Sequence, residues 1–265
     1  MSTGEALPTS ASPLFIGWDV GGWNCDKNPA SRDALVVLDA KRQLLGKPWR
    51  GNLRRCINQA ADTPEFIAQL LELCELDVTP FASTPVVLAI DTPLGFSTAF
   101  IELIVQGRAA GPIGNAASNP YLYRRTERYL FERGLMPLSA IKDMIGSQAT
   151  KGMHVLARFA PHIQSPGVWT DHQYLRAIEA YPSAAKRSSH VAALLAALPE
   201  QGAFAHADIG DAYLCALVAW QFHYQPLQLV QPEPGVDSRE GWIYVPVDSL
   251  SSARTCPSAG SGIEV

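Results

Sequence analysis

Short apolar runs that end in an acidic residue are the clearest pattern along this chain. Residues 14–18 lead to Asp19, residues 86–90 lead to Asp91, and turn-forming residues follow each aspartate at once. Apolar runs of this length, bounded by turn residues, are typical of buried strands. We therefore predict two buried strands, each with a carboxylate at its carboxyl end.

The rest of the pattern predicts alternating strands and helices. A helix is expected to begin near Thr63, with Thr63 as its N-cap and Pro64 in its first turn. Further strands are predicted at residues 33–40, 47–54, 176–181 and 241–246, and further helices at 98–107, 121–133 and 210–224. This order predicts an α/β fold with a mixed sheet flanked by helices.

The chain is interpreted as one domain over residues 14–248. Residues 97–167 combine helical pieces with a loop rich in Gly, Ala, Asn and Pro, so they are predicted to form a helical insertion. Residues 1–13 and 249–265 are rich in small and polar residues, which is typical of flexible tails. An apolar content of 47% is enough for a single sizeable core.

Composition also limits where the protein works and what it binds. Five cysteines without a CxxC pair predict reduced thiols, and no secretory signal or apolar run of membrane-spanning length is visible. We therefore expect a cytoplasmic protein with no membrane partner. The net charge of −4 excludes a generally basic surface but leaves room for a local basic groove that binds nucleic acid.

Acidic residues recur at comparable positions of the predicted elements. Asp19, Asp91 and Glu179 come at the ends of predicted strands, while Asp208 and Asp211 open the last large helix, one turn apart. Carboxylates gathered in one space repel each other unless a cation neutralises them, and Mg²⁺ prefers oxygen ligands. The pattern therefore predicts a site for Mg²⁺ or Mn²⁺.

Each of these acids also has a simpler interpretation. Asp19 and Asp91 precede turn residues and would suit a turn, and Asp208 would suit a helix N-cap. Glu179 is harder to explain in this way, because glutamate is rare in strands and in cores unless it is paired. Independent caps and turns have no reason to converge at one end of a sheet, so the joint pattern favours a site.

The segments that carry these acids resemble a known family. They are residues 17–23, 90–95, 125–128, 179–183, 208–212 and 240–246. Together they resemble the family catalogued as domain of unknown function number 429, whose members are predicted to be ribonuclease H-like nucleases. The late Asp-x-x-Asp-Ala is also similar to the closing element of Holliday-junction resolvases. The resemblance implies a ribonuclease H-like sheet and implies Asp19, Asp91, Glu179, and Asp208 or Asp211 as catalytic metal ligands.

Four further residues are candidates for substrate binding. Arg125 and Glu127 fall in one of the resembling segments, within a stretch that interleaves aromatic and cationic side chains. Lys151 and Lys186 are placed to bring positive charge near the mouth of the site. The alternative is that the aromatic stretch is an amphipathic helix with surface ion pairs, and that both lysines are solvated surface residues.

Three functions follow from this pattern. The first is a divalent-metal-dependent nuclease that hydrolyses phosphodiester bonds of DNA or RNA. The second is a nucleotide-binding phosphotransferase or ATPase similar to actin and sugar kinases, in which Asp19 to Gly22 would form a phosphate-binding turn. The third is a catalytically silent scaffold. The sequence does not select the substrate or indicate an oligomeric state.

Overall fold

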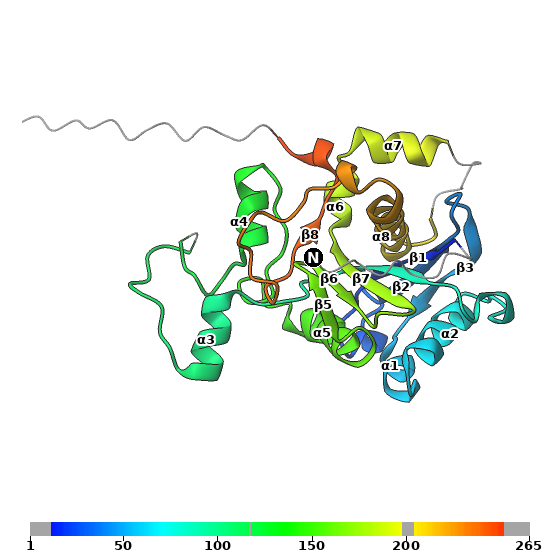
Figure 1. Cartoon of the computed structure of the whole chain (residues 1–265), viewed down its shortest axis with the longest axis horizontal. Coiled ribbons are helices and arrows are strands. Elements are labelled where there is room, and N and C mark those ends of the chain that lie inside the picture. Colours follow the sequence, from blue (N-terminus) through cyan, green and yellow to red (C-terminus); the bar gives the residue numbers. More distant parts are fainter. Residues whose placement is uncertain (1–11, 117, 198–203, 252–265) are drawn as a thin grey trace, which may run out of the picture.

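A single sheet of eight strands forms the centre of the described part of the molecule (Figure 1). A computed structural model describes residues 12–116, 118–197 and 204–251. The strands are β1 (Leu14–Asp19), β2 (Asp33–Leu38), β3 (Leu44–Gly51), β4 (Val86–Asp91), β5 (His162–Ser165), β6 (Val168–Thr170), β7 (Leu175–Ala180) and β8 (Ile243–Tyr244). Within these residues no helix combines the length and apolarity that crossing a membrane requires.

The sheet is mixed, with parallel strands at its centre. The strand order is β3-β2-β1-β4-β7-β6-β5, and β8 continues the edge of β7 beyond β6. The pairs β1–β4, β4–β7 and β7–β8 are parallel, whereas β2 and β6 run antiparallel to their neighbours. The carboxyl ends of β1, β4 and β7 therefore meet at one edge of the sheet.

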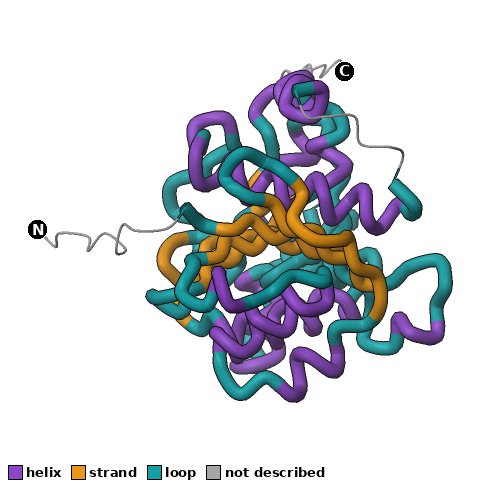
Figure 2. Tube along the Cα trace, turned by 90° about the vertical axis from the view of Figure 1, so that its right-hand side faces the viewer, coloured by secondary structure: helices purple, strands orange, loops and turns teal. Residues whose placement is uncertain are grey.

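Helices cover both faces of the sheet (Figure 2). They are α1 (Arg54–Gln59), α2 (Thr63–Leu73), α3 (Thr98–Gln106), α4 (Arg125–Glu132), α5 (Gly146–Phe159), α6 (Pro182–Ala185), α7 (Ser189–Ala196) and α8 (Ala207–Tyr224). Phe15, Val87 and Ile178 lie in the apolar layer with α8. Ile16 and Leu88, the next residues along, point the opposite way and pack with α1, α2 and α5. The predicted α/β fold with a mixed sheet flanked by helices is confirmed.

One glycine allows α8 to cross β1 at very short range. A Cβ at Gly17 would lie 1.8 Å from the carbonyl oxygen of Ala212 and 2.4 Å from the amide nitrogen of Ala216. Any side chain there would collide with helix backbone, so only glycine permits this contact. The crossing brings the first turns of α8 close to the carboxyl end of β1.

The region predicted as a helical insertion, 97–167, has two parts. α3 and α4 stand beside the sheet (Figure 1). In contrast, α5 buries Val155, Leu156 and Phe159 in the apolar layer opposite α8, and residues His162–Ser165 form the edge strand β5. α5 and β5 therefore belong to the main fold, where α5 covers one face of the sheet and β5 is its edge strand.

Glu240 fixes the amino-terminal ends of both α3 and α4. Its Oε1 accepts the backbone N–H of Thr98 at 2.6 Å, and its Oε2 accepts the backbone N–H of Arg125 at 2.9 Å. Amide groups in the first turn of a helix have no partner within the helix, and a negative charge there is favourable. One carboxylate thus accepts a hydrogen bond from the first turn of each helix.

Several element boundaries differ from those predicted. The N-cap of α2 is Asp62, whose Oδ1 accepts the Glu65 N–H at 2.9 Å, so Thr63 is the first helical residue. β3 begins at Leu44 rather than at residue 47, and α4 begins at Arg125 rather than at residue 121. α1, α6, α7, β5 and β6 were not predicted, because each is too short to show a clear period.

The predicted tails fall mostly outside the described residues, which begin at residue 12 and end at residue 251. At the carboxyl end, residues 249–251 pack onto the domain instead of leaving it. Ser249 is buried, and the N–H of Ser251 donates to the carbonyl oxygen of Arg133 at 3.0 Å. The domain therefore extends slightly beyond the predicted boundary at residue 248.

Candidate functional site

Asp19 and Asp91 lie side by side at the carboxyl edge of the sheet. They end the parallel strands β1 and β4 and are paired in register. Gly17 and Ala89, two residues earlier on each strand, lie beneath α8, and alternation places both aspartates on that same face. The structure thus brings together the two acids that the sequence pattern singled out.

The first turns of α8 add two more carboxylates. α8 begins after His206, whose Nδ1 accepts the Asp208 N–H at 3.2 Å, so the cap is His206 and Asp208 lies inside the helix. The alternative that Asp208 is the N-cap is therefore wrong. Asp211 follows one turn later, on the side that faces Asp19 and Asp91.

The four acids act on one another electrostatically. Burial, followed by the negative charges of Asp91, Asp208 and Asp211, raises the pKa of Asp19 from its usual 3.8 to about 9. Burial, followed by the charges of Asp211 and Glu179, raises the pKa of Asp91 to about 8, and Lys186 opposes this shift. A nearby cation would reverse both effects, because it favours the ionised form.

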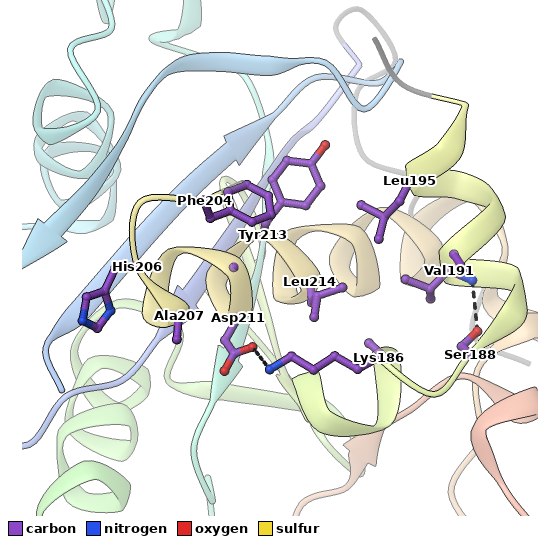
Figure 3. A pocket seen from close by; sticks show the side chains of 13 residues that line it. Lys186, Ser188, Val191, Leu195, Phe204, His206, Ala207, Asp211, Tyr213 and Leu214 are labelled. Atoms are coloured by element: carbon purple, nitrogen blue, oxygen red, sulfur yellow. Dashed lines mark hydrogen bonds and ion pairs between the residues drawn. The ribbon is translucent and has the colours of Figure 1, made fainter. Parts of the chain in front are cut away.

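Two cations already contact the cluster. Arg50 Nε lies 2.8 Å from Asp208 Oδ2, which also accepts the backbone N–H of Arg32 at 3.0 Å. Lys186 Nζ lies 2.5 Å from Asp211 Oδ1 (Figure 3). Lys186 was predicted as a substrate-binding residue, and it does lie at the cluster, with about half of its side chain exposed.

Asp19 and Asp91 differ from the two helix acids, each of which has a cationic partner. Within the described residues, neither carboxylate makes a hydrogen bond or an ion pair. In the same part of the chain, no group of three or more His, Cys, Asp or Glu side chains is arranged to hold a metal ion. A cation at Asp19 and Asp91 that also used Asp211 would have to replace Lys186 on that carboxylate.

Glu179 is not part of this cluster. It pairs in register with Ile90, one residue before Asp91, so its side chain leaves the opposite face of the sheet. There it is buried, and Arg124 contacts both of its oxygens, at 2.8 and 2.6 Å. The Leu94 N–H donates to it as well, at 2.9 Å. The expected role of Glu179 in completing the metal cage is not supported by this placement, because its oxygens are already occupied.

Glu127 belongs to the same buried ionic group as Glu179. It is 1% exposed and accepts both the backbone N–H of Arg124, at 2.6 Å, and its Nε, at 2.9 Å. Burial raises the pKa of Glu127, and the charge of Arg124 opposes this shift. Burial lowers the pKa of Arg124, but the charges of Glu127 and Glu179 raise it further than burial lowers it. The predicted substrate contact of Glu127 is not available, because the side chain is enclosed.

Arg125 is exposed but lies away from the acids. Its Nε contacts Glu233 Oε2 at 3.0 Å, and its backbone is held by Glu240. Arg125 thus forms a surface ion pair, but with Glu233 from a distant part of the chain and not with Glu127, and any substrate contact of Arg125 stays a prediction.

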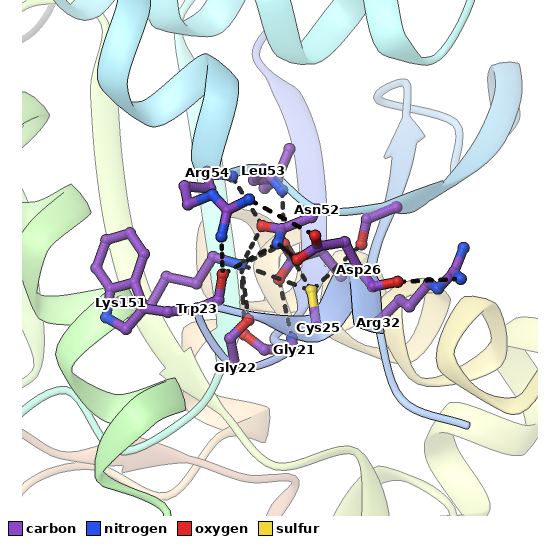
Figure 4. Close-up of polar contacts among 12 residues, drawn as sticks. Gly21, Gly22, Trp23, Cys25, Asp26, Arg32, Asn52, Leu53, Arg54 and Lys151 are labelled. Atoms are coloured by element: carbon purple, nitrogen blue, oxygen red, sulfur yellow. Dashed lines mark hydrogen bonds and ion pairs between the residues drawn. The ribbon is translucent and has the colours of Figure 1, made fainter. Parts of the chain in front are cut away.

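Lys151 was expected near the mouth of the site, and it is instead completely buried, with its polar contacts drawn in Figure 4. Its ammonium forms an ion pair with Asp33 and lies 3.4 Å from the carbonyl oxygens of both Gly21 and Gly22. Burial raises the pKa of Asp33, and the charge of Lys151 opposes that shift. Lys151 thus holds the turn after β1 in place and cannot meet a substrate.

Three residues that contribute to this region were not identified from the sequence. Asp33 begins a strand, where aspartate is disfavoured, and that was a usable signal. Arg124 directly precedes the segment that was singled out, but its partners come from distant parts of the chain. Arg50 lies in an exposed strand and shows no local pattern.

Comparisons of the chain with protein-family models, with curated proteins and with solved structures return no match.

Proposed function

We propose that this protein is a divalent-metal-dependent phosphodiester hydrolase that acts on nucleic acid. The observation that supports this most strongly is the pairing of Asp19 with Asp91 at the ends of adjacent parallel strands. Both carboxylates are largely enclosed, both have raised pKa values, and neither has a direct partner within the described residues. Such an arrangement lowers the stability of the fold, and costly arrangements of this kind are typical of binding and catalytic sites.

The donor set suits Mg²⁺ or Mn²⁺. Asp19 and Asp91 would hold the ion, and Asp211 or Asp208 would complete its ligands from α8 once released by Lys186 or Arg50. These are hard oxygen donors, which both ions prefer over nitrogen or sulfur. A divalent ion bound there would lower the pKa of an attacking water and stabilise charge on the leaving oxygen. The proposed role of Lys186 is to pair with Asp211 in the free protein and to meet a phosphate when the ion is bound.

The strand order supports a ribonuclease H-like architecture. In the order β3-β2-β1-β4-β7, β2 is antiparallel to its neighbours, and β4 and β7 are parallel to β1. This agrees with what the resemblance to the family of domain of unknown function number 429 implies. The acid positions at the ends of β1 and β4 and on the last long helix also agree with it.

The phosphotransferase alternative is less well supported. A phosphate-binding turn must offer free backbone N–H groups to the ligand. Here the N–H of Gly21 donates to Asp33 Oδ1 at 2.9 Å, and the N–H of Trp23 donates to Ser147 Oγ at 3.0 Å. One N–H of the proposed turn, and that of the residue directly after it, are thus already used by the protein's own side chains.

A nuclease panel tests the proposal. Single-stranded DNA, single-stranded RNA and duplexes are incubated with wild type, Asp19→Asn and Asp91→Asn, each with Mn²⁺, Mg²⁺ or EDTA. We expect cleavage by wild type only with a divalent ion, and at least a hundredfold loss in both variants. Asp77→Asn, which changes an exposed acid far from the cluster, is the matched control. The proposal fails if no substrate is cleaved, or if both site variants cleave like the control.

A further inference from the structure

A pocket of about 450 Å³ opens beside the acidic cluster, between α6, α7 and α8. Val191 and Leu195 of α7 and Leu214 of α8 form its apolar part (Figure 3). Phe204, which is 38% exposed, adds an aromatic ring to the lining. Mostly apolar walls with a few polar groups, in a volume of about 300–1,000 Å³, are typical of sites for small organic ligands.

The pocket and the acidic cluster share side chains. Lys186 and Asp211, which form an ion pair, line the pocket, and His206 lies at its rim. Asp211 also raises the pKa values of Asp19 and Asp91, so it lies within electrostatic reach of both. A ligand whose apolar part entered the pocket would therefore hold its charged part at the acids.

We propose, on the basis of the proposed function, that this pocket receives one unpaired base of a nucleic-acid strand whose scissile phosphate lies at Asp19 and Asp91. An unpaired base has two apolar faces that suit aliphatic and aromatic walls, and its phosphate is anionic, as Lys186 requires. A base within a duplex is covered on both faces and paired at its edge, so it cannot enter. The site should therefore act on single strands or on unpaired positions.

Ala192 and Ala193 provide a matched pair of variants. Both are exposed and both lie on α7, but only Ala192 lines the pocket. Ala192→Phe would fill the pocket from its rim, whereas Ala193→Phe adds the same ring outside it. Phe204→Ala, which removes one aromatic ring from the lining, is a second route to the same loss. Thermal melting of each variant verifies that it is folded.

The binding test uses adenosine, which has no phosphate and therefore needs no metal ion. Its affinity is measured by NMR titration at millimolar concentrations, in EDTA, with wild type and the variants. We expect Ala192→Phe and Phe204→Ala to raise Kd about tenfold or more, and Ala193→Phe to leave it within twofold of wild type. The proposal is overturned if wild type does not bind adenosine, or if Ala192→Phe and Ala193→Phe have the same effect.

A cleavage assay with Mn²⁺ separates this proposal from the proposed function. If wild type cleaves nucleic acid but Ala192→Phe keeps the same KM and the same ratio of single-strand to duplex cleavage, the base pocket is refuted and the nuclease stands. If adenosine binds as expected but no nucleic acid is cleaved, the nuclease is refuted. A raised KM on single strands in Ala192→Phe alone supports both.

Discussion

Asp91→Asn is expected to stabilise the metal-free protein at alkaline pH. Folding places the Asp91 carboxyl where its pKa is about 8, whereas an ordinary aspartate has 3.8. Between these two values the folded state binds a proton that the unfolded state has released. The contribution of this carboxyl group to the free energy of unfolding is therefore fully present below about pH 4, and it is lost as the pH rises through about 8.

The size of the effect follows from the same two values. A tenfold change in a protonation equilibrium is worth about 1.4 kcal/mol, so a pKa raised from 3.8 to about 8 gives an upper limit of about 6 kcal/mol. Asp91 keeps some contact with solvent, which reduces this figure. We expect Asp91→Asn to increase the free energy of unfolding by about 2–4 kcal/mol at pH 8.5 and by much less at pH 5.

Urea unfolding in EDTA at pH 5 and pH 8.5 measures this difference. Asp33→Asn is the matched control, because Asp33 is also a buried acid but is paired with the fully buried Lys151. Its substitution leaves an unpaired cation and should destabilise the protein by about 3–5 kcal/mol. The reasoning is refuted if Asp91→Asn is no more stable than wild type at pH 8.5, or if its effect is the same at both pH values.

Three further substitutions test the rest of the account. Gly17→Ala should destabilise the protein by at least about 3 kcal/mol in urea unfolding, because its Cβ would collide with the backbone of α8. Glu179→Gln should lower the free energy of unfolding by about 2 kcal/mol or more, because it removes the negative charge that pairs with buried Arg124. The same substitution should leave Mn²⁺ affinity unchanged in calorimetric titration. Lys186→Met should instead tighten Mn²⁺ binding about threefold by freeing Asp211, and a weaker affinity would contradict this.

Local pattern was sufficient for the long elements and for the acids at strand ends. β1 and β4 are short runs that are apolar up to their final aspartate and are followed by turn residues, whereas the apolar stretch of α8 is longer, so length and flanking residues decide the type of each element. The meeting of Asp19 with Asp91 followed from the rule that carboxyl ends of parallel strands share one edge of a sheet. Strand type and strand direction are enough to predict this contact.

The sequence could not show on which face each acid lies. Asp91 is the last residue of β4, whereas Glu179 is the residue before the last of β7 and pairs with Ile90 instead of Asp91. A shift of one position sends a side chain to the opposite face. Register depends on contacts between distant segments, and so do the partners of Arg124 and Lys151. The face on which Glu179 lies and the partners of Arg124 and Lys151 are therefore visible only in the folded structure.

The double attachment at Glu240 has a mechanical consequence for α3 and α4. Because one carboxylate closes the first turns of both helices, neither helix can fray at its amino-terminal end without weakening the other. Arg124, at the start of α4, is in turn fastened to β7 through Glu179. Opening of α3 would therefore have to begin at its carboxyl-terminal end, because its amino-terminal end is joined through Glu240 to α4, and α4 is joined to the sheet.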